Sequence, residues 1–373
     1  MIKEYTSLGM MSGTSGDGVD ASVIVSDGYD NYKVLDEKYY TYEENIFNNF
    51  HDLKNKINNI NDLNKNSTQI KNLEKKITLF HAKIVKDFSQ KYDLDIVGFH
   101  GQTIFHSPSD KKSIQIGDAK LLFQLVKKKI VYNFRLNDML NGGEGAPLTP
   151  IFHKLLIKKL KINLPISVMN IGGIANLTLI KNFENKNILS KDIGPGNCLI
   201  DNWIRTNSNK KFDIDGKISS KGEVNKIILE QAIDLYENFN LKNDHKSFDV
   251  KDFDLSFIRG LSLEDGAATI IEYTAKILAA SINDLQIKND IKNLLIVFCG
   301  GGRKNNNLIN RIRFYSNKEI SFSFTDDYKI DGDFIESQAF GYLAIRSLLN
   351  LDISFPNTTG CLNSCTGGIL IND

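Results

Sequence analysis

Cysteine, proline and net charge are all scarce in this sequence of 373 residues, which has four cysteines, six prolines and a formal net charge of +1. So few cysteines argue against a disulfide framework. A nearly neutral chain offers no basic field for nucleic acid. No run of about twenty apolar residues occurs, so we expect no membrane span. The opening MIKEYTSLGMM lacks an apolar signal core, and we therefore expect a cytoplasmic protein.

Several common site motifs are also missing. The six histidines form no HExxH pattern, and no G-x-x-x-x-G-K-[ST] string is present. The glycine run GTSGDG has the wrong spacing for a dinucleotide fingerprint and leads into a strand pattern. Cys361 and Cys365 form a single C-x-x-x-C, which is weak as a metal motif and more typical of ordinary loop cysteines.

Glycine-rich turns between strands are what the sequence does contain. Alternating apolar residues flank the turn in LGMMSGTSGDGVDASV at 8–23, and the pattern returns in ISVMNIGGIANLTLI at 166–180. A third strand, LLIVFCGGG at 294–302, runs straight into three glycines. Backbone amides in such turns bind anions, and phosphate is the commonest of them. The repeated hairpin predicts a duplicated α/β architecture, although any one hairpin could be a plain tight turn.

Helical periodicity fills the intervals between these strands. Apolar residues three or four apart over 67–92 predict a helix with Ser67 or Thr68 as its N-cap. Further helices are predicted around 267–282 and over 335–349. With 41 % apolar residues and this length, two domains are expected.

Asp192, in KDIGPGNCLIDNW at 191–203, is the best catalytic candidate. The Gly-Pro-Gly turn after it would present the carboxylate at a strand end, close to the start of a helix. Such a carboxylate can act as general base toward water or a hydroxyl, and the alternative is a capping role. Arg135, in a polar loop at 132–150, could bind an anionic group or pair with Asp138 on the surface. Gln102, at the end of a buried strand, suits a hydrogen bond to a sugar.

These segments together resemble one family. GMMSGTSGDGVD, GFHGQTIFHSP, QIGD, GGEGAPLTP, NIGGIANLT, DIGPGNCLIDNW, CGGG and ESQAFGYLA stand in the order seen in the anhydro-N-acetylmuramic acid kinases, over nearly the whole chain. The resemblance implies a duplicated actin-like ATPase (ribonuclease H-like) fold, α/β in class, with two domains and a central interdomain cleft. We expect domain I to comprise 1–130 and about 350–373, and domain II to comprise 131–349.

The resemblance also implies an activity. Members of the family use ATP and Mg²⁺ to open 1,6-anhydro-N-acetylmuramic acid with water and to phosphorylate O6, which gives N-acetylmuramic acid 6-phosphate and ADP in cell-wall recycling. Asp192 would be the general base. Gln102, Arg135 and Glu336 would contact the substrate, and Asp17 and Asp20 would hold the metal through water. The ATP-binding residues would be Gly13, Thr14, Ser15, Gly16, Asp17, Gly18, Val19, Asp20, Gly172, Gly173, Gly300, Gly301, Gly302 and Asn305.

Three positions depart from the family pattern. Gly16 stands where the family usually has Leu, Asn133 stands for Asp, and HKSFDVK at 245–251 keeps only Lys246 and Ser247 of a P-K-S-T-G-R-E stretch. Two alternatives therefore stay open: a non-catalytic sugar- or nucleotide-binding protein of the same fold, or a kinase for another amino sugar. The sequence gives no partner beyond the substrate, neither nucleic acid nor membrane, and a homodimer is one option for its assembly.

Overall fold

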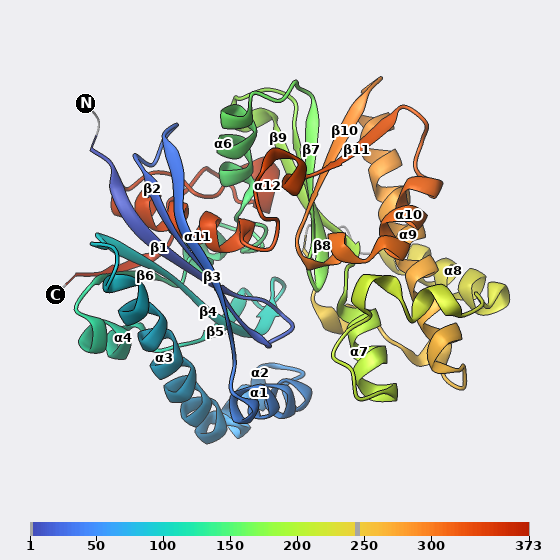
Figure 1. Cartoon of the computed structure of the whole chain (residues 1–373), viewed down its shortest axis with the longest axis horizontal. Helices are drawn as coiled ribbons and strands as arrows, with labels where there is room; N and C mark the ends of the chain where they lie inside the picture. Colours follow the sequence, from blue (N-terminus) through green and yellow to red (C-terminus); the bar gives the residue numbers. More distant parts are fainter. Residues whose placement is uncertain (1–2, 243–246, 373) are drawn as a thin grey trace. The chain divides into compact units, whose positions relative to one another are not determined.

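The computed structural model describes residues 3–242 and 247–372. The chain forms two compact units (Figure 1). Unit 1 comprises Met1–Lys161, Glu184–Lys186 and Asp333–Asp373, and unit 2 comprises Ile162–Phe183 and Asn187–Gly332. These limits differ from the division expected at 130/131 and 349/350, because 131–161 and 333–349 pack with the N-terminal residues.

The sheet of unit 1 has the strand order β12-β6-β4-β1-β2-β3, with β5 paired to β4. Its strands are β1 (Tyr5–Ser12), β2 (Gly18–Ser26), β3 (Tyr32–Thr41), β4 (Ile96–Ser107), β5 (Lys112–Ile116), β6 (Lys129–Tyr132) and β12 (Ile369–Ile371). β1, β2 and β3 are antiparallel neighbours, whereas β1, β4 and β6 run parallel. The predicted hairpin at 8–23 is thus confirmed as β1 and β2.

Helices pack on both faces of this sheet (Figure 1). The helices of unit 1 are α1 (Glu44–Lys56), α2 (Ile60–Lys65), α3 (Ser67–Ser89), α4 (Ala119–Val126), α5 (Leu136–Leu140), α6 (Pro150–Leu160), α11 (Ile335–Leu348) and α12 (Pro356–Thr359). Phe50 of α1 and Ile77 of α3 share a core with Leu8 and Val97 of the sheet. α11 approaches the other face so closely that a Cβ on Gly9 would lie 1.9 Å from the Ser337 carbonyl oxygen.

The sheet of unit 2 has the order β11-β10-β7-β8-β9. Its strands are β7 (Ile166–Ile171), β8 (Ile174–Ile180), β9 (Ile188–Pro195), β10 (Leu294–Cys299) and β11 (Ile320–Phe324). β7, β8 and β9 are antiparallel neighbours, and β7, β10 and β11 run parallel. The second predicted hairpin is therefore confirmed as β7 and β8.

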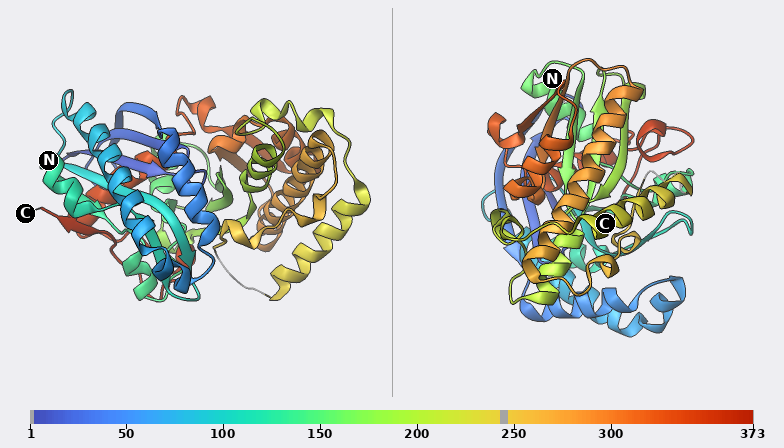
Figure 2. Two further views of the ribbon diagram at one scale, coloured as in Figure 1. Left: turned by 90° about the horizontal axis from the view of Figure 1, so that it is seen from below. Right: turned by 90° about the vertical axis from the view of Figure 1, so that its right-hand side faces the viewer.

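One face of this second sheet is covered by α7 (Cys198–Asn207), α9 (Leu263–Lys288) and α10 (Asn306–Tyr315), whereas α8 (Lys226–Lys242) packs against α9. α9 and α10 lie side by side (Figure 2). Apolar residues of the strands, such as Met169, Leu177 and Phe298, point toward these helices and form the core of unit 2. The opposite face of the sheet carries more polar side chains, and one of them is Asp192.

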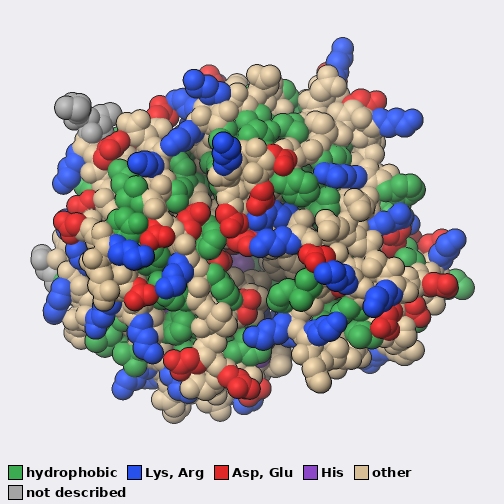
Figure 3. Space-filling model, viewed as in Figure 1, with side chains coloured by type: hydrophobic (Ala, Val, Ile, Leu, Met, Phe, Trp, Pro, Cys, Tyr) green, Lys and Arg blue, Asp and Glu red, His purple; other side chains and the backbone are tan. Residues whose placement is uncertain are grey.

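The two sheets share one topology. In each, three antiparallel strands are followed by two parallel ones: β3-β2-β1-β4-β6 in the first sheet and β9-β8-β7-β10-β11 in the second. The first sheet adds β5 and β12, which are antiparallel to their neighbours. This repetition confirms the expected duplicated, ribonuclease H-like α/β fold. Lysine, arginine and acidic side chains intermingle over the face in Figure 3, in keeping with the near-zero net charge. Among the described residues, no helix has the length and apolar character needed to cross a membrane.

Candidate active site

In the loop between β1 and β2, the carbonyl groups of Gly13 and Thr14 are bound, and the amide groups of Thr14 and Ser15 are available. The Gly13 carbonyl accepts from the Gly16 amide (3.1 Å), and the Thr14 carbonyl accepts from Lys54 Nζ (3.1 Å). Within 3–242 and 247–372, the amides of Thr14 and Ser15 donate to no protein acceptor. Gly16 has φ +62°, which places the loop in the left-handed region. Amides arranged in this way, with a lysine ammonium nearby, favour an anionic ligand.

Gln102 lies under this loop and is fully buried. Its Nε2 donates to the Gly13 carbonyl (2.8 Å), and its Oε1 accepts from the Ser12 hydroxyl. Both ends of the side-chain amide are therefore used inside unit 1. Gln102 therefore supports the first glycine loop, whereas the sequence had led us to expect a contact with the substrate.

Asp17 and Asp20 stand on either side of the start of β2. Asp17 Oδ1 accepts from the Ser15 hydroxyl at 2.5 Å. Burial and, next, the charge of Asp17 raise the pKa of Tyr39 well above its usual value, so Tyr39 stays protonated beside it. Asp20 is half-buried in β2, opposite Met11 of β1. Carboxylate oxygens next to an anion-binding loop are suitable ligands for Mg²⁺, which takes oxygen ligands and retains several waters.

Arg135, His100 and Glu336 form a polar cluster in unit 1. Arg135 donates to the Gly145 carbonyl (2.7 Å) and to His100 Nε2 (2.9 Å). Burial and the Arg135 charge lower the pKa of His100 well below its usual value, so the ring is neutral. Burial raises the pKa of Glu336, and the charge of Arg135 partly offsets that rise. The cluster brings together two of the predicted substrate residues.

The alternative surface pair between Arg135 and Asp138 is wrong. Asp138 is 1 % exposed. Its carboxylate accepts from the Gly145 amide (2.6 Å) and the Thr359 hydroxyl (2.5 Å). Asp138 therefore stabilises the loop that follows Arg135, and the guanidinium turns to His100 instead.

In unit 2, the loop between β7 and β8 is the counterpart of the first glycine loop. The Gly172 carbonyl accepts from the Asn197 amide (2.7 Å), and the Gly173 carbonyl accepts from the Gly196 and Cys198 amides (3.0 and 3.1 Å). In the described part of the chain, the amides of Gly172 and Gly173 donate to no protein acceptor. The start of α7 thus fixes the carbonyls and leaves both amides for another acceptor.

The three glycines after β10 lie against this same loop. A Cβ on Gly302 would come 2.2 Å from Cγ2 of Ile171, whereas a Cβ on Gly301 would meet only Asn197 Nδ2 at 3.9 Å. Asn305 caps α10, because its Oδ1 accepts from the Leu308 amide (3.1 Å). The predicted residues 172–173, 300–302 and 305 therefore belong to one connected region of unit 2.

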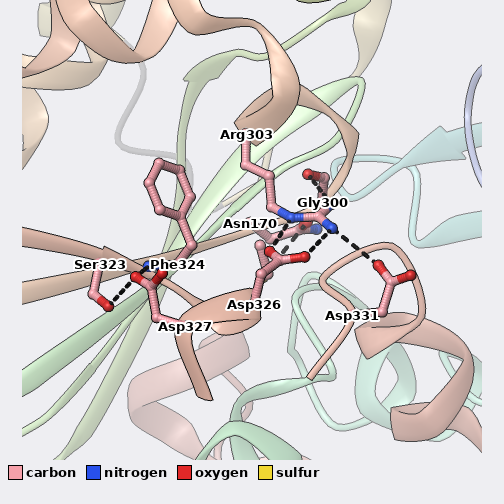
Figure 4. Close-up of polar contacts among 9 residues, drawn as sticks. Asn170, Gly300, Arg303, Ser323, Phe324, Asp326, Asp327 and Asp331 are labelled. Atoms are coloured by element: carbon pink, nitrogen blue, oxygen red, sulfur yellow. Dashed lines mark hydrogen bonds and ion pairs between the residues drawn. The ribbon is translucent and has the colours of Figure 1, made fainter. Parts of the chain in front are cut away.

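Arg303 holds this region together (Figure 4). Its guanidinium donates to both carboxylate oxygens of Asp326 (2.6 and 2.9 Å), to Asp331 Oδ1 (2.9 Å) and to the Gly300 carbonyl (3.0 Å). The hydrogen bond from Arg303 lowers the pKa of Asp326, so the pair stays ionised. The bidentate geometry on a side chain that is 5 % exposed makes this a firm support for the glycine loop.

Asp192 belongs to a polar row across the second sheet. Paired positions on neighbouring strands place Cys299, Asn170, Asn176 and Asp192 in line, on the face opposite α7, α9 and α10. A register shift between Ala175 and Asn176 lies beside Asp192, where β9 approaches its Gly-Pro-Gly end. Asp192 is 9 % exposed, and its Oδ2 accepts from the Phe248 amide at 2.8 Å. A carboxylate held in this way is positioned for proton transfer.

Three supporting residues were not predicted from the sequence. Lys54 is distant in sequence and reaches Thr14 from α1, so no local pattern indicates it. Arg303 directly follows the three glycines, and this position in the sequence could have indicated that its side chain supports the loop. Phe248 belongs to the divergent 245–251 segment; His245 and Lys246 of that segment lie outside the described residues. The bond from its amide to Asp192 connects that segment to the candidate base.

Comparison with known proteins agrees with these features. A family model described as anhydro-N-acetylmuramic acid kinase matches residues 5–372. The chain is 54 % identical to the anhydro-N-acetylmuramic acid kinase of Pelagibacter ubique (strain HTCC1062), with 100 % of each chain covered. It is 35 % identical to the protein of the same name in Rhodopseudomonas palustris, with 98 % of each chain covered. The chain belongs to the anhydro-N-acetylmuramic acid kinase family.

Proposed function

We propose that this kinase opens 1,6-anhydro-N-acetylmuramic acid with water and transfers the γ-phosphoryl group of ATP to O6. Water adds to C1, and the bond between C1 and the bridging oxygen breaks. The released O6 takes the phosphoryl group, and the products are N-acetylmuramic acid 6-phosphate and ADP. The substrate is the one that the names of the relatives state, and the reaction would serve recycling of cell-wall peptidoglycan.

Asp192 is the general base in this proposal. The observation that carries it is the position of the carboxylate, in a polar row that runs across the sheet to Cys299, directly before the glycine loop. The Phe248 amide donates to Oδ2 and orients the group, and in this proposal the carboxylate takes a proton from the attacking water. Ser247, next to Phe248, has a buried hydroxyl with no protein partner in the described residues and could bind the same water.

The amides of the two glycine loops bind the phosphates of ATP. The carbonyls of residues 13–14 and 172–173 are already bound to protein donors, so the amides of residues 14–15 and 172–173 meet an anion without unpairing any group. The segment from Gly300 to Asn305 lies near the adenosine. Asp17 and Asp20 would hold Mg²⁺ through water, and the ion supplies neutralisation of the charge that develops on the phosphates.

Arg135 and Glu336 bind the sugar. The guanidinium is fixed by Gly145 and His100, so it offers a pre-oriented positive group to the lactyl carboxylate. Gln102 acts indirectly in this proposal. Both polar atoms of its side chain already bond to protein groups, so it supports the first glycine loop.

Replacement of Asp192 tests the assigned role. Asp192→Asn keeps the shape and removes the proton acceptor, and we expect turnover to fall by about 10² to 10⁴. Asp234→Asn, at an exposed position of α8, is the matched control and should retain full activity. The measurement is ADP release with and without the anhydro sugar.

The outcomes separate the remaining alternatives. Near-normal turnover of Asp192→Asn would remove the base from the mechanism. ADP release that the sugar does not stimulate in the unmodified chain would favour a non-catalytic binding protein. Stimulation by another amino sugar, but not by the anhydro sugar, would point to a different kinase substrate.

A further inference from the structure

Two thiols and a carboxylate meet in the C-terminal part of unit 1, apart from the residues proposed for catalysis. Ligand atoms of Asp138, Cys361 and Cys365 all lie within 4.8 Å of one another. Asp138 comes from α5, Cys361 follows α12, and Cys365 pairs with Ser354 in an isolated bridge. Two segments far apart in sequence therefore converge on one small volume.

The backbone around this cluster is held from both sides. The Glu144 amide donates to the Thr359 carbonyl and the Leu362 amide donates to the Asn141 carbonyl, each at 2.9 Å. A Cβ on Gly143 would lie 2.2 Å from Asp138 Oδ2, so a glycine is required for the chain to pass the carboxylate. The cluster is thus a fixed arrangement, because its two loops are joined independently of the side chains in question.

The cluster is buried and has an excess of potential negative charge. Asp138, Cys361 and Cys365 are 1 %, 2 % and 8 % exposed. Within the described residues, no lysine, arginine or histidine forms an ion pair with Asp138; its partners are the Gly145 amide, the Thr359 hydroxyl and the Cys361 thiol. A buried carboxylate without a cation is costly, and a bound cation would offset that cost.

We propose that Asp138, Cys361 and Cys365 form a binding site for a thiophilic divalent cation, Zn²⁺ in the first place. Thiolate sulfur and carboxylate oxygen are both ordinary zinc ligands, and Ca²⁺ or Mg²⁺ would not select thiols. Three protein ligands leave one coordination position, which water fills. Zinc binds as both thiols lose their protons to solvent, so the ion gains two thiolates and the carboxylate.

The site is connected to the polar cluster by one residue. Asp138 accepts from the Gly145 amide, and the Gly145 carbonyl accepts from Arg135. A bound ion would fix the loop that holds the guanidinium. The binding itself does not depend on the kinase reaction, so its failure leaves the proposed function untouched.

Titration of the purified, reduced chain with Zn²⁺ and with Co²⁺ tests the site. We expect one equivalent to bind, with a thiolate-to-cobalt charge-transfer band in the near ultraviolet. Cys361→Ser and Cys365→Ser should each weaken zinc binding by more than about 10²-fold. Cys198→Ser is the matched control, because Cys198 is equally buried at 8 % exposed but lies in unit 2. It should bind zinc as the unmodified chain does.

A second measurement uses the unmodified chain and does not require a folded variant. Alkylation with iodoacetamide and peptide mapping should show that one equivalent of Zn²⁺ slows modification of Cys361 and Cys365 but not of Cys198. The proposal is overturned if the chain binds no zinc, if binding survives both serine substitutions, or if zinc protects neither thiol of the pair.

Discussion

Gln102 holds the first glycine loop through its side-chain amide. Its replacement should therefore weaken the binding of ATP. Gln102→Met keeps the length of the side chain but removes two buried hydrogen bonds, one to the Gly13 carbonyl and one from the Ser12 hydroxyl, a loss of about 1–3 kcal/mol. We expect the KM for ATP to rise about tenfold or more, with little change in the KM for the sugar. Gln115→Met, on β5, is the control. A rise confined to the sugar KM would instead make Gln102 a substrate contact.

Single residues show where sequence reasoning reaches its limit. Asp192 could be identified because strand, Gly-Pro-Gly turn and helix start are local features, and the structure places it near the end of β9 as expected. Its bond to the Phe248 amide could not, because the two residues are 56 positions apart. The buried state of Asp138 was hidden for the same reason, since its hydroxyl partner, Thr359, is 221 positions away.

At the scale of elements, the glycine loop after β10 allows a matched pair of substitutions. Gly302→Ala should destabilise the chain, because the new methyl group would lie 2.2 Å from Ile171, and overpacking of this kind costs about 1–3 kcal/mol. Gly301→Ala has room in the protein and should leave the melting temperature unchanged. If ATP approaches the loop, Gly301→Ala should still raise the KM for ATP. An unchanged KM would remove the loop from the nucleotide site.

Helices with a regular spacing of apolar residues could be predicted from the sequence, but the residues at which they begin and end could be predicted less well. The stripe through Ile70, Ile77 and Ile84 predicts a helix that the structure confirms as α3, Ser67–Ser89. The expected cap is wrong: Ser67 is the first helical residue, and Asn66 precedes it without a side-chain cap bond. The loop expected at 132–150 contains the short helix α5, which a five-residue segment with polar positions does not reveal.

At the scale of the whole molecule, the duplicated topology could be predicted from the two hairpins, because each hairpin is a local pattern and the two are alike. The limits of the compact units could not be predicted, because α11 packs on the first sheet and α6 packs against α11, through contacts far apart in sequence. Surface composition gives no signal for such packing.

Buried histidines in unit 1 make the stability of the molecule sensitive to acid. Burial lowers the pKa of His81 to about 4 and that of His153 to about 3. Below pH 6.5 the unfolded chain binds protons that the folded chain excludes, so the stability present above pH 6.5 is lost as the pH falls toward 4. Each such histidine contributes a slope of about 1.4 kcal/mol per pH unit.

His81→Phe tests this dependence. The substitution keeps an aromatic ring beside Phe99 and removes the titrating group. Urea unfolding at several pH values between 4 and 7 should give a slope that is smaller than that of the unmodified chain by about 1.4 kcal/mol per pH unit. Parallel profiles for the two chains would show that His81 already binds its proton in the folded state.

The central claim is that water, activated by Asp192, opens the sugar at C1 while O6 receives the phosphoryl group. Mass spectrometry of the product formed in ¹⁸O-labelled water tests it most directly, with unlabelled product incubated in the same water to correct for spontaneous exchange at C1. The account predicts one ¹⁸O on C1 and none in the phosphate. Label in the phosphate, or a product without label at C1 beyond the exchange control, would contradict it.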